Sequence, residues 1–374
     1  MILIAAFLTY NILLLLMVFL PAGKIINHKS IVSLKSETDS FRWNKRLAFI
    51  ILAVATVAGM RESFVGTDYH SYLDFYNNIL DYGSFPNYSL GREIGWNYLN
   101  LWFGKLGVPS GIFFGFVAGL TWYFFIKGSY KFQFLLPLMF FFFMVHYFFW
   151  TMSGLRQSIA IVIFFYSIKF IIERNPIYYI SSILIASLFH LSVLIMLPIY
   201  LLSKIKFNRK LFFILYVLSI FFIGNEWFLN QMSQLIVFIS SKVEVLSSYL
   251  FYLDSDSFTA QEKRTSSGLG IILTIITVFF ILYKSEEVLK KQPKLTIYFV
   301  LFFIAVILNN IFLSVEVIGR ALTYLMICFP IVMASTVYYS TKKYERMVVI
   351  LLIIAYFMIF NVQIYRIFSY GENL

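Results

Sequence analysis

The sequence predicts an all-α integral membrane protein, and three observations lead to this fold class. Of 374 residues, 60% are hydrophobic and 13% are charged, whereas roughly a quarter are charged in soluble domains. The apolar residues form long continuous runs instead of alternating with polar ones. Basic residues gather in every second connection between these runs. Since lipid offers no partner to open backbone groups, continuous runs of this kind must be helices.

About 12 hydrophobic helices are expected, in one polytopic domain that covers residues 1–374. The runs lie near residues 2–20, 47–61, 109–126, 134–151, 157–172, 177–189, 191–203, 211–224, 268–283, 295–313, 321–339 and 347–363. No basic residue precedes Lys24, so the first run lacks the start of a signal peptide and is interpreted as a retained span.

The basic residues predict how the chain is oriented. With the N-terminus outside, the inner connections hold 20 Lys and Arg residues and the outer segments hold nine. This bias follows the positive-inside rule and accounts for the net charge of +12 without a nucleic acid partner. Both termini are therefore expected on the outer side.

The segment 177–203 has two interpretations. As one tilted span, it would move 11 basic residues of later connections to the outer face. A hairpin of two short helices avoids this and places His190 at its outward-facing tip. Helices of about 13 residues do not cross a 30 Å core, so the tip is expected to lie below the headgroups.

Two long outer-face loops are expected, at 62–108 and 225–267. In the second, Leu229–Tyr252 has apolar residues at three- and four-residue steps, which favours an amphipathic helix at the outer interface over a span. The inner connections after residue 46 are short. Because long loops carry function more often than tight connections, the outer face is the expected working face.

Four arginines lie where hydrophobic spans end on this outer face. They are Arg61, Arg156, Arg264 and Arg320. Arg156 and Arg320 are expected at helix N-termini, where arginine and free N–H groups together form an anion pocket. The alternative is that these arginines only reach toward the interface.

Carboxylates and aromatic rings occur together in the first outer loop, which contains Asp68 and Glu93 beside Tyr69, Tyr72 and Trp96. Sugars stack on aromatic faces and bind carboxylates through their hydroxyls, although an interfacial aromatic belt would have the same composition. His190 follows a dozen apolar residues. It is either a functional group or a histidine that stabilises a tight turn.

No metal or other cofactor is expected. The histidines lack metal-ligand spacing, and the chain has a single cysteine, Cys328, so it cannot form a disulfide within the chain. Phosphate-binding glycine loops and serine-nucleophile motifs are also absent from the sequence.

The order of these short motifs resembles the EpsG family, which belongs with the Wzy-type polymerases of O-antigen, capsule and exopolysaccharide. The motifs are Arg61, Gly66-Thr67-Asp68-Tyr69 with Tyr72, Glu93-Ile94-Gly95-Trp96, Leu155-Arg156-Gln157, His190-Leu191-Ser192 and Arg320. The resemblance covers residues from about 60 to 325. It implies polymerisation of oligosaccharide repeat units carried on undecaprenyl pyrophosphate, at the outer face of the bacterial cytoplasmic membrane.

The resemblance also implies partners and roles. The growing lipid-linked chain is the donor, and a new lipid-linked repeat unit is the acceptor. Membrane lipid surrounds both. Whether a chain-length regulator also binds is left open. Arg156, Arg320, Arg61 and Arg264 are expected to bind pyrophosphate. His190 and Asp68, ahead of Glu93, are the candidate general bases. Tyr69, Tyr72, Trp96 and Gln157 are expected to contact substrate.

Two other classes stay open. A membrane O-acyltransferase of surface glycans would need to handle acyl-CoA at the inner face, where acidic and aromatic candidates are few. A flippase or transporter of lipid-linked oligosaccharides would carry charges in mid-membrane and symmetric repeats. Here the charges gather at span ends, and no repeat is evident.

Overall fold

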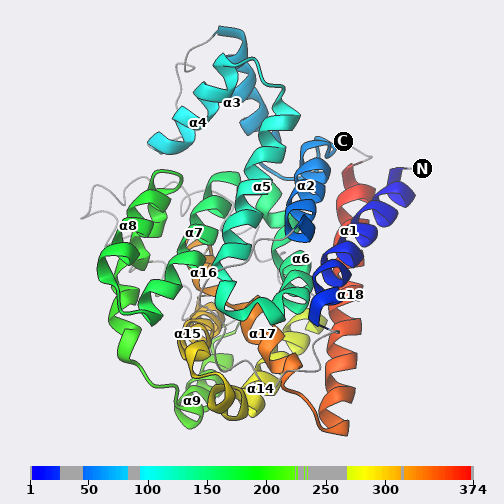
Figure 1. Cartoon of the computed structure of the whole chain (residues 1–374). Coiled ribbons are helices and arrows are strands. Elements are labelled where there is room, and N and C mark those ends of the chain that lie inside the picture. Colours follow the sequence, from blue (N-terminus) through cyan, green and yellow to red (C-terminus); the bar gives the residue numbers. More distant parts are fainter. Residues whose placement is uncertain are drawn as a thin grey trace. The chain divides into compact units, whose positions relative to one another are not determined.

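The computed structural model describes residues 2–25, 45–82, 93–223, 225, 231, 234, 268–312 and 316–371. Every regular element in these ranges is a helix (Figure 1). The described chain divides into two compact units, residues 1–203 with 333–374, and residues 204–332. The prediction of a single domain for residues 1–374 stays a prediction.

Unit 1 contains most of the helices. They are α1 (Ile2–Ile25), α2 (Lys45–Gly59), α3 (Tyr69–Tyr82), α4 (Ile94–Lys105), α5 (Ser110–Gly128), η1 (Tyr130–Leu135), α6 (Leu136–Ser153), α7 (Leu155–Ile172), α8 (Pro176–Ser187), η2 (Leu191–Lys204) and α18 (Lys343–Gly371). Unit 2 contains α9 (Arg209–Ile220), α14 (Gly268–Lys291), η4 (Pro293–Leu295), α15 (Thr296–Ile311) and α16 (Glu316–Met326). The chain returns to unit 1 within α17 (Phe329–Tyr338).

Eight segments of the described chain are long and apolar enough to cross a membrane. They are Ile2–Pro21, Ser110–Gly128, Lys131–Ser153, Leu155–Ile172, Gly268–Lys291, Pro293–Ile311, Ile318–Tyr338 and Lys343–Ser369. The other four predicted runs correspond to the short helices α2, α8, η2 and α9. The predicted fold class, a polytopic all-α membrane protein, is confirmed.

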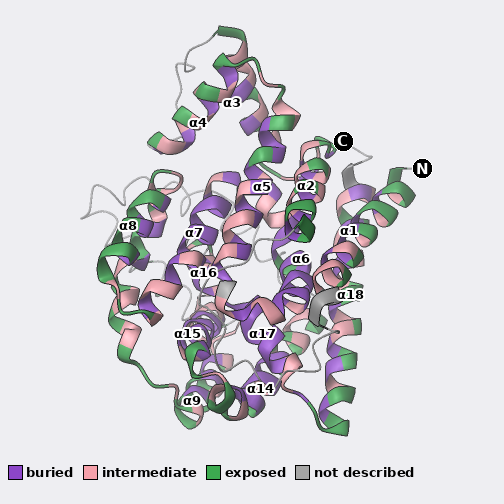
Figure 2. Ribbon diagram, viewed as in Figure 1, coloured by how far each residue is buried: buried purple, intermediate pink, exposed green. Residues whose placement is uncertain are grey.

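Burial separates central from peripheral helices within unit 1. The span of α7 is 72% buried, whereas those of α1 and α18 are 28% and 22% buried (Figure 2). On α1 the exposed side chains Ile4, Leu8, Leu15 and Phe19 recur at helical spacing and form a face suited to lipid. α2, α5, α7 and α8 follow one another in a row of packed neighbours, and α1 packs on α6 and α18.

Polar side chains connect helices inside each unit. The Asn11 Nδ2 on α1 donates to the Asn361 Oδ1 on α18 over 2.8 Å. In unit 2, the Asn310 Nδ2 on α15 donates to the Ser219 Oγ on α9 over 2.9 Å. Side-chain hydrogen bonds between helices of this kind stabilise helix packing within a membrane, where apolar side chains pack equally well against lipid.

The predicted hairpin at 177–203 is confirmed as two short elements, α8 and η2, with His190 between them. The first predicted loop differs from expectation, because residues 62–108 contain α3 and α4. In α3, Tyr72, Phe75, Tyr76 and Ile79 recur at three- and four-residue steps and are buried. Leu229–Tyr252 and the rest of the second predicted loop lie outside the described residues, apart from isolated positions.

Candidate functional site

The site begins at a break between two central helices of unit 1. α6 ends at Ser153, and Gly154 leaves the helical conformation with φ −92° and ψ 60°. α7 then starts at Leu155, so Arg156 lies in its first turn, as the sequence predicts. A cation is disfavoured here by the helix dipole, so Arg156 needs an anionic partner.

The start of α4 is fixed to the α8–η2 turn. The Gly95 and Trp96 N–H groups both donate to the Leu188 carbonyl, over 2.8 and 3.2 Å. A Cβ at Gly95 would lie 2.7 Å from the Leu188 Cβ, so only glycine permits this approach. The contact brings Glu93, directly before α4, next to His190, directly after Leu188 and Phe189.

Glu93 joins three of the predicted motifs in one contact set, which we name the Glu93 cluster: Glu93, Arg156 and His190. The Glu93 Oε2 accepts from the Arg156 Nη1 over 2.8 Å, and the Glu93 Oε1 lies 3.1 Å from the His190 Nδ1. The side chains are 8%, 20% and 26% exposed for Glu93, Arg156 and His190. The carboxylate is therefore enclosed, whereas the arginine and the histidine remain accessible.

The electrostatics of the cluster keep Glu93 ionised. Burial alone would raise the pKa of Glu93, but the hydrogen bond with His190 and the charge of Arg156 outweigh it and lower that pKa. A carboxylate held in this state is a weak proton acceptor. Because the His190 Nδ1 faces the carboxylate, we assign the ring proton to Nδ1, which leaves Nε2 as an acceptor.

Two predicted aromatic residues support the cluster. The Arg156 Cζ lies 5.8 Å from the centre of the Tyr72 ring, and Tyr72 in turn meets Trp96 edge to face with ring centres 5.4 Å apart. Burial raises the pKa of the Tyr72 hydroxyl, opposed by the charge of Arg156. Trp96 is fully buried, so its ring shapes the environment of Tyr72 from inside the protein.

Arg61 lies in a second arrangement at the same helix break. It is 7% exposed, and its Nη1 and Nη2 donate to the carbonyls of Ala58 and Met152 over 2.9 and 3.4 Å. Its guanidinium also lies 4.7 Å from the centre of the Tyr69 ring and 5.2 Å from that of Phe114. These contacts connect the end of α2 to the end of α6.

The residues after Arg61 reinforce this connection. Gly66 has φ +114°, and a Cβ there would lie 2.7 Å from the Met152 carbonyl oxygen. The Thr67 N–H donates to the Ser153 Oγ over 3.2 Å. The segment 61–67 thus holds the α6–α7 break, three residues from Arg156.

The remaining predicted residues lie elsewhere. Asp68 is exposed directly before α3, 3.3 Å from the Thr67 hydroxyl, and its charge acts on Tyr72. Gln157 is 8% exposed in α7. Arg320 is exposed on α16 in unit 2, and Arg264 lies outside the described residues. Their predicted roles stay predictions.

The chain is therefore a polytopic helical membrane protein with an arginine–carboxylate–histidine cluster beside a break between central helices. Residues 46–371 match the EpsG family, so the chain belongs to this family of polysaccharide polymerase-like membrane proteins. It is a membrane protein related to polysaccharide biosynthesis. Neither a curated protein nor a solved structure matches the chain.

Proposed function

We propose that the protein polymerises undecaprenyl-pyrophosphate-linked oligosaccharide repeat units into O-antigen, capsule or exopolysaccharide chains. The reaction takes place at the outer face of the bacterial cytoplasmic membrane. The observation that carries this proposal is the Glu93 cluster, in which an arginine able to bind phosphate and a histidine able to accept a proton share one carboxylate. Membership of the EpsG family supports a role in polysaccharide biosynthesis.

The proposed step is a glycosyl transfer. A hydroxyl oxygen of the lipid-linked acceptor bonds to the anomeric carbon at the reducing end of the donor chain. The bond between that carbon and the donor's pyrophosphate breaks, and the electron pair stays with the lipid pyrophosphate. The hydroxyl proton passes to a general base of the protein. The lipid-linked product is longer by one repeat unit.

Arg156 is the proposed contact of the leaving pyrophosphate. A guanidinium has N–H donors in a planar fork that matches phosphate oxygens. The Arg156 side chain contacts Glu93 and is 20% exposed, so it remains accessible to a ligand. Stabilising the charge that develops on the leaving group is usually the largest catalytic contribution. Arg320 and Arg264 are proposed as further phosphate contacts. For Arg61, the two carbonyl partners favour a positioning role at the helix break.

His190 is the proposed general base. Glu93 binds Nδ1, so Nε2 is left to accept the acceptor proton, and the carboxylate stabilises the imidazolium that forms. Glu93 thus orients both partners without taking the proton itself. Tyr69 and Tyr72 are proposed to contact sugar, and Trp96 packs against Tyr72 from the interior. Gln157 is proposed as a further substrate contact. Asp68 is the alternative base.

The test is complementation of a gene deletion in the native host, at matched expression. The strains compared express wild type, Arg156→Ala, His190→Ala or Glu93→Gln. The control is Glu62→Gln, which alters an exposed glutamate of the same predicted outer loop, 62–108. We expect the deletion to leave single-repeat glycans, and only wild type and the control to restore a ladder of long chains. Long chains in the deletion strain with altered acylation would instead indicate an acyltransferase. Unpolymerised units trapped at the inner face would indicate a transporter.

A further inference from the structure

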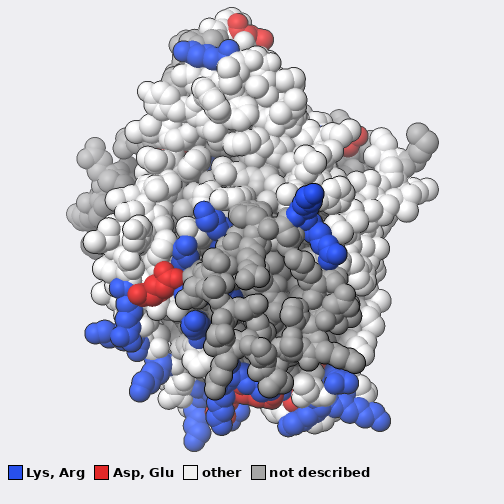
Figure 3. Space-filling view, in the orientation of Figure 1, with Lys and Arg blue, Asp and Glu red and all other residues white. Residues whose placement is uncertain are grey.

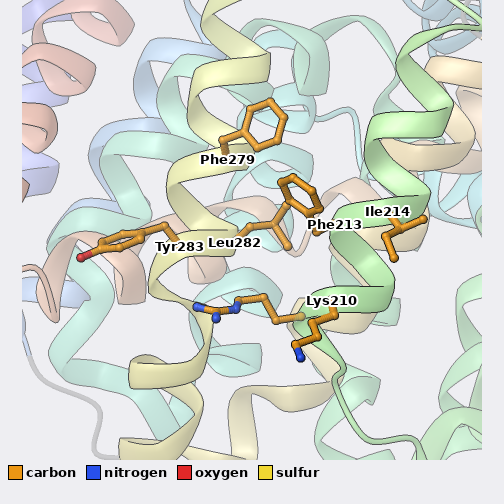
Figure 4. Close-up of a pocket in the computed structure, with 7 residues that line it drawn as sticks. Lys210, Phe213, Ile214, Phe279, Leu282 and Tyr283 are labelled. Atoms are coloured by element: carbon orange, nitrogen blue, oxygen red, sulfur yellow. The ribbon is translucent and has the colours of Figure 1, made fainter.

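Unit 2 contains a cleft of about 450 Å³ between α9 and α14. Arg209, Lys210, Phe213, Ile214, Phe279, Leu282 and Tyr283 line it (Figure 4). Its volume falls in the range of roughly 300–1,000 Å³ that is typical of small-molecule sites. The cleft lies within one unit and shares no residue with the Glu93 cluster.

The walls of the cleft are hydrocarbon and lie along a membrane span. Phe213 and Phe279 have ring centres 5.9 Å apart, and Leu282 lies beside them (Figure 4). On α9, Phe213 and Ile214 are 47% and 54% exposed, and on α14, which is a candidate membrane span, the lining residue Tyr283 is 46% exposed. Exposed apolar side chains on a span are solvated by lipid tails, so a hydrocarbon chain is the natural occupant of this part.

One end of the cleft is basic. The Arg209 Nε pairs with the Glu286 Oε1 over 3.1 Å, which fixes the arginine at the cleft mouth, and Lys210 follows it. Both cations lie in the first turn of α9, where the helix dipole opposes them. The same end of α14 carries Lys290 and Lys291. The lining thus includes two cations; Arg209 is paired with Glu286, which is not a lining residue, and the charge of Lys210 favours an anion beside it.

We propose that this cleft binds an anionic glycerophospholipid, with its phosphate at Arg209 and Lys210 and an acyl chain between Phe213 and Leu282. Basic pockets between membrane helices recognise anionic headgroups by this combination of charge and hydrocarbon. Basic side chains also predominate among the charged groups on the face shown in Figure 3. The inference rests on unit 2 alone and does not depend on the proposed polymerase activity.

The headgroup contact is tested by native mass spectrometry of the full chain with equimolar phosphatidylglycerol and phosphatidylcholine. We expect wild type to retain phosphatidylglycerol preferentially. Arg209→Gln with Lys210→Gln should reduce this preference about 25-fold, at about fivefold per charge. Lys210→Gln alone should reduce it about fivefold and serves if the double variant is unstable. The control is Lys343→Gln with Arg346→Gln, which removes two exposed charges from the first turns of α18 and should change nothing.

The hydrocarbon contact is tested with Ile214→Trp, which places a bulky side chain in the cleft and leaves its charges intact. The control is Ile350→Trp on α18, since Ile350 is 55% exposed and Ile214 is 54% exposed. We expect Ile214→Trp alone to weaken phosphatidylglycerol retention. Equal retention of the two lipids by wild type would overturn the proposal. So would an equal loss of the phosphatidylglycerol preference in the Arg209→Gln, Lys210→Gln variant and in the Lys343→Gln, Arg346→Gln control. Displacement of phosphatidylglycerol by equimolar undecaprenyl phosphate would assign the cleft to the isoprenoid carrier instead.

Discussion

Glu93 is the residue on which the account of the site depends. It lies 63 positions before Arg156 and 97 before His190 in the chain, yet its two oxygens contact both. The sequence predicts each of the three as a candidate: Glu93 as a carboxylate among aromatic residues, Arg156 as a cation at a helix N-terminus, and His190 as a histidine after a dozen apolar residues. It does not predict that Glu93 orients the other two, since that follows from contacts between distant segments.

Removing the Glu93 charge should destabilise the protein. In Glu93→Gln, the buried carboxamide cannot satisfy the Arg156 and His190 donors as a carboxylate does, at a cost of about 1–3 kcal/mol. We expect a lower melting temperature in detergent, measured by thermal unfolding. Glu62→Gln, at an exposed position, should melt with wild type. Identical melting of Glu93→Gln and wild type would contradict the contacts described.

The comparison of wild type with Glu93→Gln also predicts how thermal stability depends on pH. The pKa of Glu93 is lowered from its ordinary 4.5, so its contribution to stability is present above pH 4.5 and is lost as the pH falls through the folded-state pKa. The difference in melting temperature between wild type and Glu93→Gln should not shrink between pH 7 and pH 5. It should shrink only on further acidification. A difference that disappears between pH 7 and pH 5 would show that the pKa of Glu93 is raised.

At the scale of elements, hydropathy and charge predict the helices well and their packing poorly. The hairpin at 177–203 is predicted because the alternative places basic residues on the wrong face. The helices α3 and α4 are missed, although the spacing of Tyr72, Phe75, Tyr76 and Ile79 indicates the first of them. The aromatic residues of this segment are compatible with an interfacial belt and with sugar contact, and neither interpretation indicates a helix. The break between α6 and α7 is also predicted, because one apolar run ends near residue 151 and the next begins near residue 157.

Contact between α4 and the α8–η2 turn should depend on Gly95. In Gly95→Ala the new methyl group would meet Leu188, moving the start of α4 and separating Glu93 from His190. Overpacking of this kind costs about 1–3 kcal/mol. We expect lower thermal stability together with shorter polysaccharide in complementation. Gly268→Ala is the control, because a Cβ there meets nothing within 4 Å. Full chain length with Gly95→Ala would show that this contact does not position the cluster.

For the whole molecule, the proposed reaction requires the cluster to lie on the outer side of the membrane. The positive-inside rule predicts this orientation from the difference between inner and outer Lys and Arg residues. The predicted orientation assigns a side of the membrane to every connection at once. A single residue that is accessible from the opposite side would therefore disprove it. The helices of the structure are compatible with either orientation, because their length and hydropathy carry no direction.

Cysteine accessibility in intact cells measures this orientation. Cys328 is the single cysteine and is buried, which gives a low background. We expect an impermeant thiol reagent to label Ser71→Cys in the predicted outer segment. Thr341→Cys, in a predicted inner connection, should react only after the membrane is permeabilised. Both side chains are exposed, so burial does not confound the comparison. The reverse pattern would place the cluster on the inner side.

The most direct test of the central claim is chain growth by the purified, reconstituted protein with a lipid-linked repeat unit as its sole substrate. Formation of the two-repeat product is followed in wild type, His190→Ala and the control His70→Ala, an exposed histidine on α3. We predict that His190→Ala slows this step by roughly 10²–10⁴-fold, as expected for loss of a general base, while substrate binding changes little. A His190→Ala protein that extends chains at the wild-type rate would contradict the assignment of the Glu93 cluster as the site of glycosyl transfer.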